Sequence, residues 1–424
     1  MQLTGRPDSI VRVFRVLLLI AAFLASVWAT RAAGADPDDA EDPAELELKP
    51  GQVPEDTATY RASSEVAAYT DTDNVSVLTP SIGFGIGNLN GASLRASYLV
   101  DVVSAASVDV VSTASPRWDE VRHAGSLSTE YKPGDFGFAL GGSVSSEPDY
   151  LSYGGFGRLI KDFSEKNWTV FLGAGVSRDV IGRCGGIDGE CTPFSVFSRR
   201  VLRSTLNGGF NLVVDTASTA GLSLDIVFDS GDQSKPYRYV PMFSPSVAPT
   251  VPRGADVDWV NSHRLPERPL EQLPLSRRRY ALTARYARRM GPATLRLMER
   301  GYSDTWGMLA SSTDARFILD LGKRFAAGAH ARFHVQGGVN FWRRAYVSGA
   351  GWDLPLYRTG DRELGPLWTA TGGLGFNAYL GSAADPQRWA LELTADGMYT
   401  SFLDTLYVVD RKAMLGALGF VGSF

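Results

Sequence analysis

Strict alternation of apolar and polar residues, repeated along the whole chain, is the feature that most constrains the fold. It is clearest in residues 279–289, 331–344 and 388–400. In the second of these, one parity carries Phe333, Val335 and Phe341, and the other carries Arg332 and His334. Successive side chains of a strand point to opposite faces of a sheet, so each segment predicts a strand with one apolar and one polar face. Strands of about a dozen residues, with aromatic residues near the ends of the apolar face, favour a transmembrane barrel over a soluble sandwich.

The connections between the expected strands sort by length. Short ones are expected at 88–91, 133–135, 164–167, 216–220, 291–292, 325–329 and 381–387, and long ones at 106–120, 179–200, 233–276 and 346–366. Every long loop then falls on the same side of the sheet. This predicts an all-β, antiparallel, up-and-down transmembrane barrel of about 16 strands, with 14 possible, short periplasmic turns and long extracellular loops.

The two ends of the chain indicate export and barrel assembly. Residues 1–35 combine arginines, an apolar run and a small-residue cleavage site, as a signal peptide does. Residues 36–57 are acidic and Pro-rich and are expected to form a flexible periplasmic segment, so the barrel occupies 58–424. The last strand alternates and ends in Phe420 and Phe424, which resembles the terminal strand of outer-membrane proteins.

One stretch conflicts with a lipid-facing surface. If Gly291-Pro292 is a two-residue turn, Met290 faces Ala293, and parity puts Glu299 on the lipid face near mid-strand. A charge there costs free energy. Either a bulge resets the register or this stretch contacts something other than lipid.

Several short motifs occur in a fixed order. They are the near-tandem repeat DVVSAASV-DVVSTAS within 101–117, Lys235-Pro-Tyr-Arg-Tyr, His263-Arg-Leu-Pro-Glu, Arg277-Arg-Arg-Tyr-Ala-Leu and Gly301-Tyr-Ser-Asp-Thr-Trp-Gly. Together they resemble an uncharacterised family of bacterial outer-membrane proteins, domain of unknown function 3570. The resemblance covers 58–424 and implies an outer-membrane barrel in a Gram-negative envelope. It implies no activity, ligand or catalytic residue.

Charged residues on the lumen parity are the main candidates for binding a solute. They are Arg279, Arg285, Arg289, Arg296, Arg300, Arg316, Arg332 and His334, with Asp225, Asp229, Asp314 and Asp320 on flanking strands. A basic wall beside acidic strands can set up a transverse field across a pore that favours anions. Cross-strand ion pairing that fills a closed interior is an equal alternative, and the simple register opposes Arg279 to Asp304.

The loop at 233–276 contains eight prolines and shows no obvious strand or helix pattern. A loop of this length is uncommon unless it is functional or disordered. We expect it to fold into the mouth as a constriction rather than to project outward as a binding surface. The candidate gate residues are Arg253, Asp256, Asp258, Trp259, Arg264, Glu267 and Arg268.

Other chemistry has little support. Cys184 and Cys191 lie in one loop of an exported chain, which favours a disulfide over a metal or redox site. We expect no metal and no cofactor. The four histidines have no sequence-close Ser/Asp arrangement of known spacing, so we do not expect an enzyme. A formal net charge of −4 argues against a nucleic-acid partner.

The sequence therefore predicts a pore or transporter for small polar, possibly anionic, solutes in the bacterial outer membrane. The alternative is a closed structural or surface-interaction barrel that binds an envelope or external partner through its loops. Expected partners are outer-membrane lipid and lipopolysaccharide, and the barrel-assembly machinery through the C-terminal strand. The oligomeric state cannot be predicted.

Overall fold

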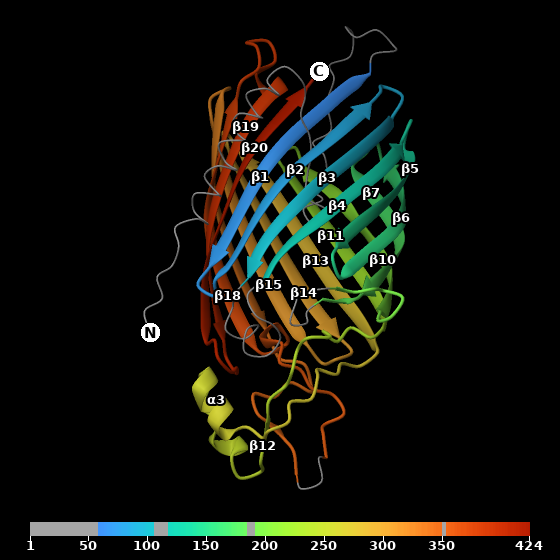
Figure 1. Ribbon diagram of the computed structural model, residues 1–424. Helices are drawn as coiled ribbons and strands as arrows, with labels where there is room; N and C mark the ends of the chain where they lie inside the picture. The colour runs from blue at the N-terminus through green and yellow to red at the C-terminus, as the bar shows by residue number, and fades with distance from the viewer. Residues whose placement is uncertain (1–57, 106–117, 185–190, 350–352) are drawn as a thin grey trace.

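A computed structural model describes residues 58–105, 118–184, 191–349 and 353–424. The chain forms a closed antiparallel barrel in which each strand pairs with its neighbours in sequence and β1 pairs with β20 (Figure 1). The barrel strands are β1 (Thr59–Asp71), β2 (Val75–Gly87), β3 (Ala92–Ala105), β4 (Trp118–Tyr131), β5 (Phe136–Glu147), β6 (Tyr150–Phe163), β7 (Trp168–Ile181), β10 (Arg199–Asp215), β11 (Ser218–Gly231), β13 (Ser276–Met290), β14 (Ala293–Asp304), β15 (Leu309–Leu321), β16 (Phe325–Gln336), β18 (Leu367–Tyr379), β19 (Trp389–Phe402) and β20 (Asp410–Ser423). The prediction of 16 strands is confirmed, whereas the expected signal peptide (1–35) and acidic segment (36–57) lie outside the described residues.

Connections sort by length between the two ends of the barrel, as predicted. The strand starts and ends place the connections after β2, β4, β6, β10, β13, β15 and β18 at the end where β20 finishes; the first six are tight turns, and the last spans 380–388. The connections of 232–275 and 337–366 both lie at the opposite end, below the strands in Figure 1. We call these the turn end and the loop end.

The strand boundaries differ most from the prediction around β16. The expected strand over 330–345 lies at Phe325–Gln336 (β16), and the expected turn over 325–329 is part of it. The preceding turn instead contains Gly322, whose φ of +77° glycine adopts without strain. The alternation continues past Gln336, but Val339 and Trp342 are buried outside the barrel wall, so this part of the strand prediction was wrong.

The outward face of the barrel is apolar. Leu172 and Leu374 point outward and are 61% and 69% exposed, which suits contact with lipid rather than water. Aromatic pairs gather near the turn end, as in Phe163–Trp168 and Trp389–Phe424. Such aromatic girdles mark the membrane interfaces of transmembrane barrels. Among the described residues, no helix is both long and apolar enough to cross a membrane.

Glu299 lies on this outward face without a bulge to move it. Met290 pairs with Ala293 across the Gly291-Pro292 turn, and the register runs unbroken to Arg279–Asp304. Ser311 Oγ and Thr313 Oγ1 each donate to a carboxylate oxygen of Glu299 at 2.5 Å. The bulge considered from the sequence is therefore absent, and two hydroxyl groups partly satisfy the carboxylate.

Glu299→Gln is expected to stabilise the barrel in lipid by about 1 kcal/mol, because a charge near the bilayer midplane is costly, while the amide can accept from one hydroxyl through its oxygen and donate to the other through its NH2 group. Urea unfolding in phospholipid vesicles measures the change, and Glu130→Gln is the control, because Glu130 lies on the lumen face and takes part in no ion pair among the described residues. A loss of stability instead would mean that Glu299 meets a polar partner rather than lipid.

Long connections at the loop end fold together into a cap, which we define as the described residues of 232–275 and 337–366. The cap contains a short helix, α3 (Val257–His263), 3-10 turns η1 (Ala248–Thr250) and η2 (Arg362–Leu364), and a parallel pair of β12 (Met242–Phe243) and β17 (Tyr346–Val347). The proline-rich segment 233–276 is thus ordered, with short helical and strand elements between its prolines. Both α3 and β12 lie beyond the strand ends rather than inside the mouth that the sequence favoured (Figure 1).

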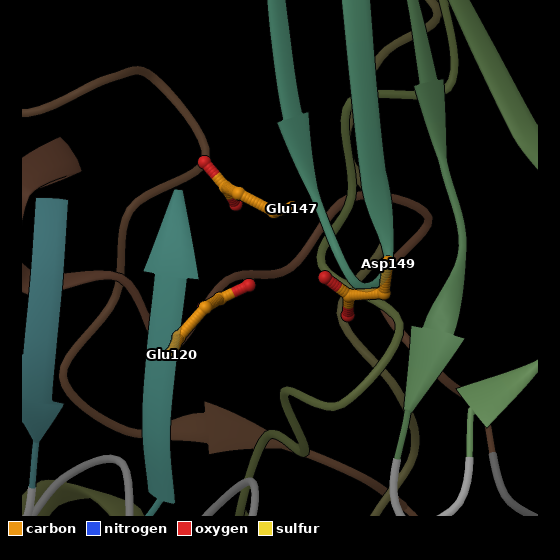
Figure 2. Close-up of side chains that lie close together, drawn as sticks. All are labelled: Glu120, Glu147 and Asp149. Carbon is orange, nitrogen blue, oxygen red and sulfur yellow. The ribbon is translucent and has the colours of Figure 1, made fainter. Parts of the chain in front are cut away.

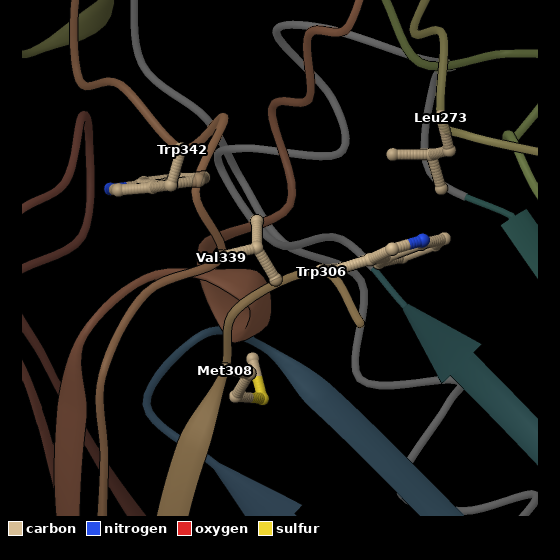
Figure 3. Close-up of a cluster of buried hydrophobic side chains, with 5 residues drawn as sticks. All are labelled: Leu273, Trp306, Met308, Val339 and Trp342. Carbon is tan, nitrogen blue, oxygen red and sulfur yellow. The ribbon is translucent and has the colours of Figure 1, made fainter. Parts of the chain in front are cut away.

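Buried apolar side chains fix the cap to the barrel rim. Trp306 and Met308, from the short β14–β15 connection, pack with Leu273, Val339 and Trp342 of the cap (Figure 3). A second cluster joins Phe243, which is fully buried, to Val260 of α3. Burial of each such side chain stabilises the fold by about 1.5–3 kcal/mol. The cap is therefore a small core of its own.

Candidate functional site

Charged residues predicted to face the lumen all share the lumen parity of their strands, and most are paired across strands. Asp229 contacts both Arg203 and Arg279 at 2.9 Å. Two further predicted pairs cross between strands, Arg289–Asp320 (2.5 Å) and Arg300–Asp225 (3.3 Å), and Arg316 pairs with Asp314 (3.5 Å) within β15. Arg277, which was not among the candidates, forms an ion pair with Asp304. Ion pairing, the alternative considered from the sequence, thus accounts for much of the basic wall.

Two of the arginines that the sequence predicted to face the lumen keep their charge unpaired. Among the described residues, neither Arg285 nor Arg332 has an ion-pair partner, and both are exposed to the lumen. Arg285 pairs with Met298, Met298 with Asp314, and Asp314 with Arg332 in successive strands. Arg285 and Arg332 therefore lie at the same level of the wall, and we call such a series of directly paired residues a register row. In the next row, Arg296 lies directly opposite Arg316. The wall of β13–β16 therefore remains basic after its ion pairs are formed.

Two histidines lie on the lumen face of β16 and contact polar side chains. His330, expected at a turn, lies within β16 between Asp314 (2.7 Å) and Asp396 (3.1 Å), because the strand begins five residues earlier than predicted. Ser312 Oγ lies 2.7 Å from His334 Nδ1, a pair that the sequence did not reveal. The other nitrogen of His334 meets Gln336 rather than an acid. Backbone N–H groups around Ser312 serve the ladders with β14 and β16, so they are not aimed at an oxyanion.

The two histidines described outside the lumen, His123 and His263, each contact an aromatic side chain. The His123 ring lies on the outward face and meets the hydroxyl of Tyr98 at 2.7 Å. His263 ends α3, where its ring stacks on Trp259 at 4.1 Å between centroids. Neither contact brings in an acid and a nucleophile together.

Predicted gate residues build and anchor the cap. Asp256 caps α3 by accepting from the backbone of Trp259 at 2.8 Å, and Trp259 packs on Phe243. Arg253 donates to the carbonyl of Phe402 at the end of β19. The others lie within the same segment: Asp258 in the first turn of α3, Arg264 on the carbonyls of Leu265 and Pro266, Glu267 exposed beside them, and Arg268 over the Tyr239 ring.

The contacts of the cap cross the mouth of the barrel. Residues 232–275 join β11 to β13, yet Gly254 bonds to Thr405 in the β19–β20 connection, five strands beyond β13. In the other direction, Tyr237 donates to Asp149 in the β5–β6 turn. The cap also holds the β1–β2 turn through Arg362 and Asp73. Chain that reaches all three positions must lie over the opening.

Three carboxylates gather under the rim at the loop end, and sequence reasoning missed them. Glu120, Glu147 and Asp149 have oxygens within 4.8 Å of one another (Figure 2). Among the described residues, this is the group with carboxylate oxygens close enough for a hard cation. Burial raises the pKa of Asp149, while the charge of Lys235 opposes that shift. Lys235 and Tyr237 both come from the cap, so the cluster serves as one of its attachment points.

A second charged group lies inside the cap. Arg238 contacts Asp361 at 2.6 Å and Glu271 at 3.3 Å, and Thr359 donates to Glu271 at 2.5 Å. Burial alone would raise the pKa of Asp361. The charge and hydrogen bond of Arg238, with the backbone N–H of Glu363, outweigh burial and lower it.

The cap is expected to loosen in acid. A depressed pKa of Asp361 means that its contribution to stability is present above the unfolded pKa of about 3.9 and is lost as pH falls through the folded value. Hydrogen exchange of residues 232–275 between pH 7 and pH 2 measures this loss. Arg238→Gln should remove most of the dependence, and an unchanged profile in that variant would contradict the assignment.

Other predicted features lie at the ends of the strands. A disulfide joins Cys184 to Cys191, as predicted, across the pair of β8 (Arg183–Cys184) and β9 (Cys191–Thr192). Phe420 and Phe424 lie on the outward face around Trp389, and Phe424 exchanges backbone bonds with Tyr60. The C-terminal strand therefore closes the barrel, while its role as an assembly signal stays a prediction.

Comparison with solved structures returns outer-membrane barrels at low identity. The siderophore receptor PirA from Acinetobacter baumannii is 12% identical with a TM-score of 0.42, and the match covers 81% of this chain and 53% of that one. CdiB from Acinetobacter baumannii is 11% identical (TM-score 0.44; 87% and 60%). OpdK from Pseudomonas aeruginosa, solved with vanillate, is 8% identical (TM-score 0.40; 87% and 99%). This chain spans about half the length of PirA.

Sequence comparison gives the family but no characterised relative. No curated protein matches the chain. A family model described as a protein of unknown function, DUF3570, matches residues 89–390, which is more than two thirds of the 424 residues. The chain therefore belongs to the DUF3570 family.

Proposed function

We propose that this chain is an outer-membrane channel that takes small anionic solutes through its basic lumen, with the cap as its gate. The carrying observation is that Arg285 and Arg332, on one register row, have no ion-pair partner among the described residues. Unpaired guanidinium groups in a narrow, low-dielectric passage attract anions and repel cations.

Gating rests on where the cap is attached. It contacts the rim at the connections β1–β2, β5–β6 and β19–β20, so solute entering from the loop end has to pass it. The attachments to β1–β2 and β5–β6 include an ion pair and a hydrogen bond that can exchange while the apolar core of the cap stays intact, whereas the attachment to β19–β20 has several hydrogen bonds and an ion pair. Rearrangement of the cap is thus the step that would admit a solute.

Placement in the membrane follows from the outward face. An apolar band with aromatic girdles, closed by β20 pairing with β1, suits the outer membrane of a Gram-negative cell. Lipid and lipopolysaccharide would surround it, and the barrel-assembly machinery would engage β20. No catalytic, metal or cofactor role is part of the proposal.

Arg285→Gln with Arg332→Gln is expected to reduce the chloride-to-potassium permeability ratio by about threefold or more, since it removes two unpaired positive charges from the β13–β16 wall. Reversal potentials of the refolded chain in planar bilayers under a KCl gradient measure it. Arg278→Gln, on the outward parity of β13, is the control. A conducting barrel without anion preference, or a double variant that retains it, would overturn the proposal.

The second candidate function is a closed barrel that binds a partner through the cap. Cross-strand ion pairs in the lumen and the packed apolar clusters of the cap favour it. It predicts a folded, heat-modifiable protein that does not conduct, even in variants that release the cap.

A further inference from the structure

The lumen has an asymmetric cross-section. Long arginine side chains line the wall of β13–β16, whereas the wall of β4–β7, across the barrel, carries glycine, serine or alanine at about half of its lumen positions, most densely along β5. A recess of about 480 Å³ lies against the small-residue wall, and its lining spans β3 to β10. This is within the volume range of small-molecule sites.

The floor of the recess is formed by glycines over which neighbouring side chains lie flat. A Cβ on Gly141 would be 2.4 Å from the Phe156 ring, and a Cβ on Gly173 would be 2.2 Å from Asn207 Oδ1. Strand pairing places Gly141 beside Phe156 and Gly173 beside Asn207. Glycine at these two positions lets the ring and the amide lie along the wall, and the Phe156 ring stays 48% exposed to the lumen.

An arginine beside this ring lacks an acceptor. Arg158 lies two residues from Phe156 on the same face, and its guanidinium carbon is 4.5 Å from the centroid of the Phe171 ring. Among the described residues, no acceptor meets its Nε, which is buried. A buried N–H without an acceptor costs about 1–3 kcal/mol, and the side chain of Arg158 itself lines the recess. Arg95, on the register row of Phe156, adds a second cation.

One carboxylate also lines the recess. Glu130 shares the register row of Arg158, with Ala139 between them, and no ion pair involving it occurs among the described residues. Two arginines against one glutamate leave the recess positively charged. The aromatic surface and the positive charge therefore lie side by side.

We infer that this recess binds a small ring-bearing carboxylate, with the ring on Phe156 and the carboxylate on Arg158. The inference rests on the proposed function and narrows its substrate class from anions in general to anions with a ring. Guanidinium groups pair with carboxylates through charge-assisted hydrogen bonds, and a flat ligand ring can stack on an aromatic side chain. The groups that recognise each half are separated by two residues on one strand face.

Isothermal titration of the refolded full-length mature chain with benzoate, cyclohexanecarboxylate and acetate tests this. Benzoate should bind at least about tenfold more tightly than acetate. Arg158→Gln should weaken benzoate binding at least about tenfold, and Phe156→Leu about fivefold. Gly141→Ala, which displaces the ring, should act in the same direction as Phe156→Leu.

Two further variants sharpen the result. Glu130→Gln should strengthen benzoate binding, because it removes the opposing charge. Phe138→Leu makes the same change as Phe156→Leu on the outward face of β5 and should leave binding unchanged. Equal affinities for benzoate and acetate, or an Arg158→Gln variant that binds benzoate normally, would overturn the inference.

The two proposals fail separately. An anion-selective barrel that does not bind benzoate would contradict the proposed binding site and leave the proposed channel function supported. Benzoate binding that depends on Arg158 and Phe156, in a barrel that never conducts, would contradict the proposed channel function and support the proposed binding site.

Discussion

Replacing Asp229 by alanine is expected to lower the free energy of unfolding of the barrel by about 3 kcal/mol. The carboxylate is fully buried and contacts Arg203 and Arg279, from strands on either side of β11, at 2.9 Å. Its removal leaves two guanidinium groups close together without their shared counter-charge. The loss is costly because the arginine side chains, 39% and 29% exposed, then repel each other across the gap, with Asp179 at 3.7 Å from Arg203 as the nearest remaining carboxylate.

Asp225→Ala is the matched control. Asp225 lies on the same face of the same strand, but its side chain is 29% exposed and its contact with Arg300 is 3.3 Å. We expect a loss below about 1 kcal/mol there, since water screens the pair. Urea unfolding in phospholipid vesicles, followed by tryptophan fluorescence, measures both. Equal losses would mean that the lumen around Asp229 is as wet as that around Asp225.

Much of the barrel could be predicted from the sequence because strand geometry is local. Alternation fixes which side chains share a face, and the Gly291-Pro292 turn fixes the pairing of Met290 with Ala293. From these two facts the lumen parity of Arg285 and Arg300 and the outward position of Glu299 follow. A barrel strand contacts its chain neighbours, so local patterns carry most of its register.

The cap could not be predicted in this way, because its contacts are not local. Val339 and Phe341 continue the apolar parity of β16, yet Gly337-Gly338 ends the strand and Val339 packs on Trp306 instead. Nothing near Val339 in the sequence distinguishes contact with lipid from contact with a tryptophan more than thirty residues away. The same holds for the prolines of 232–275, which indicated a loop but not its contacts with the opposite rim.

The acidic cluster and the recess were missed for related reasons. Glu120 lay inside an expected loop, so its strand position beside Asp149 was hidden until β4 was seen to begin at Trp118. In the recess, the sequence pattern does not distinguish the glycines from other strand residues, and only the structure shows which side chains lie over them. A sequence records the absence of a side chain but not what occupies the space.

Releasing the cap is expected to have the largest effect on passage through the barrel. Arg362 is 8% exposed, donates to Asp73 in the β1–β2 turn, and stacks over the Phe402 ring at 4.8 Å. Arg362→Ala removes both contacts and leaves Asp73 buried without this cation. The cap then loses one of its attachments, while its apolar clusters around Phe243 and Trp306 stay intact.

The expected result is a rise of about tenfold or more in time-averaged conductance, since loss of one such contact shifts a closed–open equilibrium by at least this factor. Asp73→Asn should raise it in the same direction, because it weakens the same contact from the barrel side. Arg388→Ala is the control: its Nε bonds to the Ser423 carbonyl at the turn end, far from the cap. Conductance has to be read together with protease cleavage within 232–275. Cleavage that rises while conductance stays flat would place the barrier in the ion-paired lumen, and the cap would then be a binding surface rather than a gate.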